Sequence, residues 1–89
     1  MSAVAPSRTV DALRELLTLN LRLGARGTAL DAHASLLGTL PELDSMAVVG
    51  LVSAIETRFT IVFDDEDISA RSFATLDSLA ALVDRKTAA

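Results

Sequence analysis

The sequence predicts an all-α fold: four helices in one domain spanning residues 1–89, with a long first loop and a short third helix. Leu and Ala, both strong helix formers, are the most frequent residues, whereas Gly occurs four times and Pro twice. Apolar residues recur every three or four positions in three segments, which is the spacing of one helix face. A chain of 89 residues has room for a single core. We expect the ends, residues 1–6 and 87–89, to be flexible.

The first helix is expected to begin near Ser7 or Thr9, because either hydroxyl can accept a hydrogen bond from the first turn. Its apolar stripe has helical spacing and consists of Val10, Leu13, Leu16, Leu17 and Leu21. Between positions 17 and 24, leucine also alternates with other residues, a pattern that would suit a strand. No partner strand is evident elsewhere in the sequence. We therefore prefer a helix that ends near Gly24 and Gly27.

A long connection over residues 25–44 separates the first helix from the second. Loops of this length in small domains usually carry function or pack as an ordered segment. Its leucines indicate packing: Leu30, Leu36, Leu37, Leu40 and Leu43. The second helix is expected from Ser45 to Phe59. Its predicted core face consists of Val48, Leu51, Val52, Ile55 and Phe59.

The last third of the chain predicts a short third helix and a longer final helix. After the apolar connector Thr60–Phe63, Asp64 is expected to be the N-cap of the third helix, with three further acids in its first turn. Thr75 is a suitable N-cap for the final helix. The inward face of that helix is predicted to consist of Leu76, Leu79, Leu82 and Val83. Arg85 and Lys86 lie at its C-terminal end, where cations suit the helix dipole.

Charge and composition exclude several classes of function. The net charge is −4, and residues 40–80 carry eight acids against two arginines, which is −6. An acidic surface repels phosphate backbones, so we expect no nucleic acid partner; it would steer basic partner surfaces instead. The longest apolar run, Met46–Val52, is too short to span a membrane, and we expect no membrane insertion. Without cysteine or a visible secretory signal, the expected location is cytoplasmic.

One motif indicates chemistry: Leu43-Asp44-Ser45-Met46 at the predicted start of the second helix. A serine in this position can accept a hydrogen bond from the first turn and so act as an N-cap. It can also present its hydroxyl to solvent at the tip of a rigid helix. A phosphodiester formed there would lie at the positive end of the helix dipole. On the residues alone, both interpretations remain open.

Asp-Ser followed by a bulky apolar residue resembles the attachment site of the acyl carrier proteins, and the order of helices resembles their fold over nearly the whole chain. The resemblance implies that Ser45 carries 4′-phosphopantetheine from coenzyme A, attached by a phosphopantetheinyl transferase, with Asp44 as its motif neighbour. The protein would then not be an enzyme. It would carry acyl groups as thioesters and present them, as a monomer, to loading and transferring enzymes of lipid, polyketide or related biosynthesis.

A second Asp-Ser pair, Asp77-Ser78, tests this interpretation. With Thr75 as N-cap, Ser78 lies within the first turn of the final helix, and only eleven residues follow it. The family has further helices after its attachment serine, for which there is no room here. We therefore interpret Ser78 as an ordinary helix residue.

The sequence departs from the fatty-acid carriers, whose second helix typically carries many acids. Here Met46 replaces the usual leucine, and Glu56 is the acid that remains on this helix. The run Leu40–Met46 is similar to carriers associated with exopolysaccharide and exosortase systems. The resemblance suggests a partner interface, with apolar contacts at its centre, consisting of Glu42, Met46, Val49, Gly50 and Ser53. It also suggests an apolar acyl cleft consisting of Leu43, Val48, Leu51, Val52 and Ile55.

Two alternatives remain: a peptidyl or aryl carrier domain, and an unmodified helical interaction module in which Ser45 only caps. The acidic cluster after Phe63 lacks the ligand spacing of a calcium loop, so we expect no metal site. His33 is expected to be an exposed loop histidine with only Asp31 nearby. A hydrolytic triad with Ser45 is disfavoured, because the strained turn that such a serine needs is missing.

Overall fold

The computed structural model describes the backbone of residues 4–88 and the side chains of residues 8–88. Within that range it is all-helical, without strands, as predicted. The elements in chain order are α1 (Val4–Leu21), α2 (Ala25–Thr28), α3 (Leu36–Thr39), α4 (Ser45–Phe59), the 3₁₀ helix η1 (Asp65–Asp67) and α5 (Leu76–Ala88). The four predicted helices are α1, α4, η1 and α5. Residues 4–6 and 87–88, predicted to be flexible, belong to α1 and α5, and residues 1–3 and 89 lie outside the described range.

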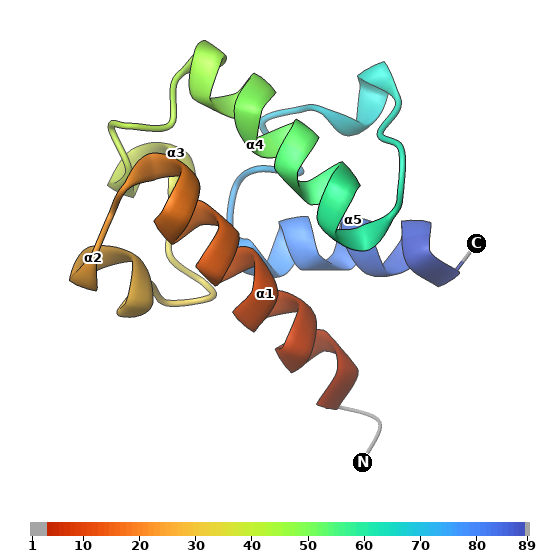
Figure 1. Ribbon diagram of the computed structural model, residues 1–89, viewed down its shortest axis with the longest axis horizontal. Coiled ribbons are helices and arrows are strands. Elements are labelled where there is room, and N and C mark those ends of the chain that lie inside the picture. Colours follow the sequence, from red (N-terminus) through yellow and green to blue (C-terminus); the bar gives the residue numbers. More distant parts are fainter. Residues whose placement is uncertain (1–3, 89) are drawn as a thin grey trace.

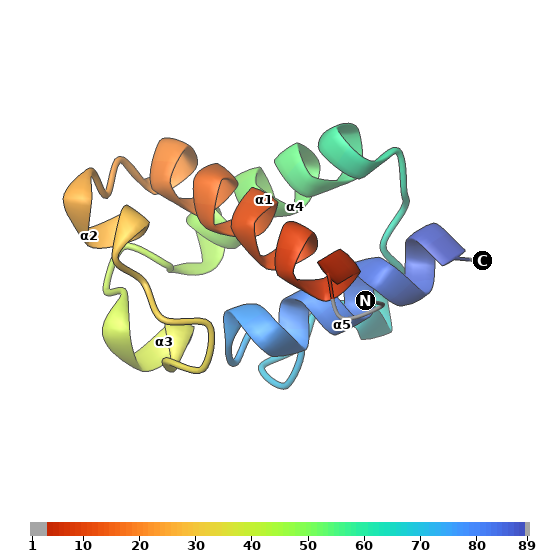
Figure 2. The ribbon, with the colours of Figure 1, turned by 90° about the horizontal axis from the view of Figure 1, so that it is seen from below.

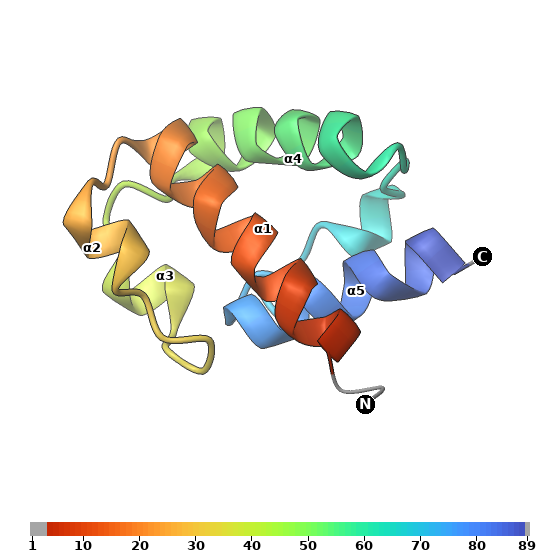
Figure 3. The ribbon, with the colours of Figure 1, turned by 60° about the horizontal axis from the view of Figure 1, so that its bottom comes forward.

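Three long helices form the body of the molecule (Figure 1). α1 runs obliquely between α4 and α5 and packs against both (Figure 3). α2 and α3 lie at the end of the molecule where α1 stops and α4 begins (Figure 2). Within the described residues, no helix is long and apolar enough to cross a membrane.

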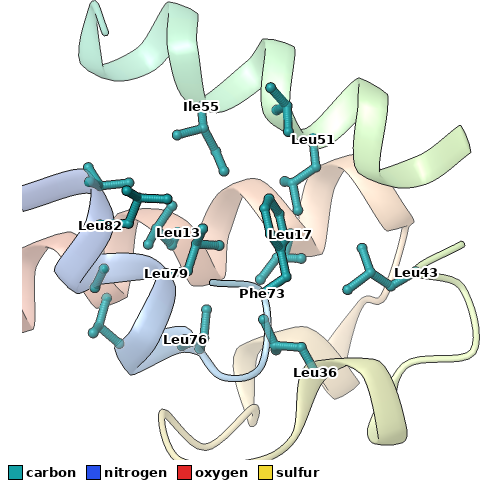
Figure 4. Packing of buried hydrophobic residues seen from close by; sticks show 14 of the residues in the cluster. Leu13, Leu17, Leu36, Leu43, Leu51, Ile55, Phe73, Leu76, Leu79 and Leu82 are labelled. Carbon is teal, nitrogen blue, oxygen red and sulfur yellow. The ribbon is translucent and has the colours of Figure 1, made fainter. Parts of the chain in front are cut away.

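The core lies where the apolar faces of α1, α4 and α5 meet (Figure 4). Leu13 and Leu17 of α1, Leu51 and Ile55 of α4, and Leu79 of α5 are completely buried. These positions follow the helical spacing predicted for each segment. The other predicted core positions differ in burial: Val10, Val52, Leu76, Leu82 and Val83 are buried, whereas Leu16, Leu21, Val48 and Phe59 are half-buried against the core. Burial of apolar surface on this scale is the main force that holds the three helices together.

The predicted start of the first helix was wrong, because α1 begins at Val4 rather than after Ser7 or Thr9. Pro6 lies in the first turn, where a backbone N–H has no helical acceptor in any case, so proline does not interrupt the helix. Thr9 lies inside the helix, is buried, and donates a hydrogen bond from its hydroxyl to Asp84 Oδ1 of α5 (2.6 Å). It joins two helices instead of capping one.

The end of α1 lies close to the predicted glycines. Arg22 adopts a left-handed φ of 55°, and the N–H of Leu23 donates to the carbonyl oxygen of Thr18 at 3.0 Å, an arrangement that commonly ends helices. Gly24 also has a positive φ, of 60°, and leads into α2. At Gly27 of α2, a Cβ atom would overlap the side chain of Thr18. The missing side chain therefore allows α2 to lie directly against α1.

The long connection is ordered by its leucines and by backbone hydrogen bonds, as expected. Four of its five leucines are buried, and Leu37, which is 46% exposed, is the exception. The N–H of Leu36 donates to the carbonyl of Ala74 (2.7 Å), and the N–H of Asp77 donates to the carbonyl of Ala32 (3.1 Å). These two bonds fasten the connection to the start of α5. The two short helices within it, α2 and α3, were not predicted.

The acidic segment after Phe63 forms η1, with Asp64 as its N-cap as predicted. Its acids face a cation: Lys86 Nζ of α5 lies 2.6 Å from Asp67 Oδ2 and 3.2 Å from Asp64 Oδ2. The hydrogen bond from Lys86 lowers the pKa of Asp67, and the same contact raises the pKa of Lys86. An ammonium group thus ties η1 to the last turns of α5.

Candidate functional site

Asp44 and Ser45 have different roles at the start of α4. Asp44 is the N-cap, and its Oδ1 accepts a hydrogen bond from the N–H of Ala47 at 2.9 Å. Ser45 is the first helical residue and is exposed, and its hydroxyl makes no hydrogen bond to any residue in the described range. The interpretation of Ser45 as the cap was therefore wrong. The carboxylate satisfies the helix terminus and leaves the hydroxyl available to solvent.

Ser78 has the opposite environment. It is half-buried, and its Oγ lies within hydrogen-bonding distance of the carbonyl oxygens of Ser72 (2.9 Å) and Thr75 (3.0 Å). Thr75 and Ser78 also cap α5 reciprocally, because each side-chain oxygen accepts the other residue's backbone N–H at 3.0 Å. The Ser78 hydroxyl is part of the fold, as expected of a helix residue. Of the two Asp-Ser pairs, the first presents a free hydroxyl.

Ser45 lies at the edge of an open apolar groove with a volume of about 570 Å³. The residues lining this groove are Leu37, Leu43, Asp44, Ser45, Val48, Val49 and Ile68. A second hollow of about 250 Å³ shares Leu37, Val48 and Ile68 and continues to Phe73. The walls come from α3, α4 and the segment after η1, so a groove forms where three elements meet beside the serine.

The five residues predicted to form a cleft are divided between the groove and the core. Leu43 and Val48 line the groove. Leu51, Val52 and Ile55 are buried, with Leu51 and Ile55 turned towards the leucines of α1 (Figure 4). They belong to the core because their positions on α4 face α1, not α3. Sequence reasoning missed Leu37 and Ile68, which complete the opposite wall.

The predicted interface residues of α4 share one exposed face. Met46 is 81% exposed and Val49 67%, and Gly50 and Ser53 are exposed beside them. Glu42 differs, because both of its carboxylate oxygens accept hydrogen bonds from the guanidinium of Arg26 in α2, at 2.6 and 2.9 Å. The Arg26 hydrogen bond lowers the pKa of Glu42. This acid is held within the molecule.

His33 has a partner that the sequence did not reveal. Its Nδ1 lies 2.6 Å from Asp77 Oδ2 of α5, and its backbone N–H donates to Asp31 Oδ1 at 2.7 Å. The expectation of Asp31 alone was wrong because Asp77 is brought close only by the fold. In the described range, no three His, Asp or Glu side chains are arranged to hold a metal ion.

A comparison with solved structures identifies a close relative. The solution NMR structure of a holo acyl carrier protein from Nitrosomonas europaea is 46% identical to this chain and superimposes with a TM-score of 0.84. The match covers 90% of this chain and 96% of that one. No family model and no curated protein matches. Identity of this extent over 90% of the chain shows that the protein belongs to the acyl carrier protein family, as a carrier and not an enzyme.

Proposed function

We propose that this protein carries acyl groups on a 4′-phosphopantetheine arm attached to Ser45. The observation that carries the proposal is the exposed Ser45 hydroxyl, without a hydrogen-bond partner among residues 8–88, at the start of α4. Asp44 caps the helix, so the Ser45 hydroxyl is not needed as a cap. The related Nitrosomonas protein is described as a holo form, which supports the same modification here.

The start of α4 suits the phosphate of such an arm. Ser45 and Met46 are the first two residues of the helix, and their N–H groups have no acceptor within it. These N–H groups and the helix dipole favour an anion at this end. When bound, the arm supplies a terminal thiol for the acyl thioester. The chain itself contains no cysteine, so no other thiol competes for the acyl group.

We further propose that the groove beside Ser45 shelters part of the acyl chain. Leu43 and Val48 of the predicted cleft line it together with Leu37 and Ile68. The second hollow extends the apolar lining to Phe73. The other predicted cleft residues lie in the core and would contribute only if the helices moved apart: Leu51, Val52 and Ile55.

The proposed partners are a phosphopantetheinyl transferase and the enzymes that load and receive acyl groups in lipid, polyketide or related biosynthesis. The exposed face of α4 is where they would approach, because it adjoins Ser45. The proposed contacts are Met46, Val49, Gly50 and Ser53, with Glu42 at the margin.

Mass spectrometry tests the attachment site. We expect the wild-type protein, incubated with coenzyme A and a transferase of broad specificity, to gain the mass of one phosphopantetheine. Ser45→Ala should gain none. Ser78→Ala, which removes the hydroxyl of the other Asp-Ser pair, should gain the full mass. An unmodified wild type, or a modified Ser45→Ala variant, would contradict the proposal and favour an interaction module.

A further inference from the structure

Exposed apolar side chains gather around Ser45. Six large apolar side chains in the described range are exposed, and four of them surround this serine. We call these four the apolar rim: Leu37, Met46, Val49 and Ile68. Leu37, Val49 and Ile68 line the same groove as Ser45, and Met46 is the residue after Ser45 in the chain. Apolar surface concentrated in this way is typical of a binding surface.

The rim comes from both sides of the groove. Met46 and Val49 lie on α4, whereas Leu37 lies on α3 and Ile68 follows η1. An enzyme that reaches the Ser45 hydroxyl must cover the surface around it. It would therefore contact α3 and the segment after η1 as well as α4.

The carboxylates near the rim are already engaged within the molecule. Glu42 is held by Arg26 through two hydrogen bonds, and Asp44 accepts the N–H of Ala47. Glu56, the remaining acid of α4, accepts a hydrogen bond from the N–H of Phe63 at 2.8 Å. Of these three acids, Glu42 is the one paired with a cation, whereas Asp44 and Glu56 accept hydrogen bonds from backbone N–H groups and keep their negative charge. Asp44 is exposed and is the one charged residue that lines the groove, so the surface around Ser45 is mainly apolar with a single carboxylate beside it.

We propose that the enzyme that modifies Ser45 docks on the apolar rim through an apolar patch of its own, with Asp44 as the one charged residue among those that line the groove. This inference rests on the proposed function and specifies the chemistry of its first partner. In this contact, Leu37 and Ile68 contribute to binding as much as Met46 and Val49 do. Since Asp44 is the one charged residue that lines the groove, the affinity depends only weakly on ionic strength.

Steady-state kinetics of the transferase test the proposal, with the carrier as the varied substrate. For the wild type, we expect KM to change less than about threefold between about 50 and 500 mM NaCl, because screening acts on charge pairs and Asp44 is the one charged residue that lines the groove. Leu37→Asp and Ile68→Asp should each raise KM about tenfold, since each places a charge in an apolar contact, and leave kcat nearly unchanged. Leu37→Ala and Ile68→Ala should give smaller increases in the same direction.

Leu19→Asp is the matched control. Leu19 is a 68% exposed leucine of α1 and lines a different hollow, with Asp11 and Arg14, so its KM should equal that of the wild type. Circular dichroism of each variant confirms that the helices are retained. Equal KM values for the Leu37, Ile68 and Leu19 variants, or a tenfold rise of the wild-type KM with salt, would overturn the proposal. A wild type that gains no mass at any salt concentration would instead overturn the proposed function itself.

Discussion

At the scale of single residues, two copies of the same dipeptide show how position within a helix determines a side chain's role. Ser45 is the first residue of α4, and Asp44 before it performs the capping. Ser78 is the third residue of α5, and its hydroxyl is bound in the first turn, while Asp77 contacts His33. The dipeptide alone does not distinguish a free serine from a bound one. The distinction comes from the residue that supplies the cap.

The division of roles at α4 predicts a difference in stability. We expect Asp44→Ala to lower the free energy of unfolding by about 1 kcal/mol, because the N–H of Ala47 loses its acceptor. Asp44→Asn should retain most of the stability, since the amide oxygen can accept the same bond. Ser45→Ala should unfold like the wild type. Urea unfolding followed by circular dichroism measures all three, and an equal loss for Ser45→Ala would show that the serine caps after all.

At the scale of secondary structure, local signals predicted the long helices and missed what depends on tertiary contacts. The bounds of α4 were predicted because the Asp-Ser pair and the apolar spacing are local signals, although the cap is Asp44 and not Ser45. The start of α1 was missed because Ser7 and Thr9 looked like suitable N-caps, whereas the helix begins before them, at Val4, with Pro6 tolerated in its first turn. α2 and α3, of four residues each, are held by packing against the rest of the fold. The groove wall formed by Leu37 could not be predicted for the same reason.

Two glycines in helices predict opposite effects of the same substitution. A Cβ at Gly27 would overlap the Thr18 side chain, whose hydroxyl donates to the carbonyl of Arg14 at 2.7 Å. We expect Gly27→Ala to lower the free energy of unfolding by about 1–3 kcal/mol, because α2 must move away from α1. A Cβ at Gly50 in α4 meets nothing within 4 Å.

Gly50→Ala should therefore raise the free energy of unfolding by about 0.5–1 kcal/mol, since alanine loses less backbone entropy in a helix. Urea unfolding of both variants checks the pair. A destabilised Gly50→Ala variant would show that this face of α4 is more crowded than the structure indicates.

At the scale of the whole molecule, polar contacts join segments that are distant in sequence around a core that is apolar. Arg26 and Glu42 are 16 residues apart, and Lys86 and Asp64 are 22 apart. Such pairs follow from no local pattern, so the sequence revealed the charged residues but not their partners. The proposed attachment serine, Ser45, was singled out because its motif is local. The apolar side chains of α3 and of the segment after η1 that lie near it became visible only in the fold.

These contacts predict how stability depends on pH. Hydrogen bonds from Lys86 and Arg26 lower the pKa of Asp67 and of Glu42 below their ordinary values of 3.8 and 4.5. A carboxylate with a lowered pKa in the folded state contributes stability that is present above its ordinary value. That contribution is lost as the pH falls through the lowered value. Lys86, with its pKa raised above 10.5, contributes below that pH and stops contributing as the pH rises through the raised value.

We therefore expect the contribution of these three groups to the free energy of unfolding to be nearly constant from about pH 5 to 10. Their contribution should fall at lower and at higher pH. Lys86→Met and Arg26→Met should reduce the acid slope, because Asp67 and Glu42 then titrate closer to their ordinary values. Arg71→Met removes an exposed cation that has no ion pair among residues 8–88 and should keep the wild-type slope. Urea unfolding at a series of pH values measures each slope. Equal acid slopes for the wild type and Lys86→Met would show that the contact between η1 and α5 contributes nothing to the pH dependence. A carboxylate with the same pKa in the folded and the unfolded chain binds no extra proton on unfolding, so it adds nothing to the slope.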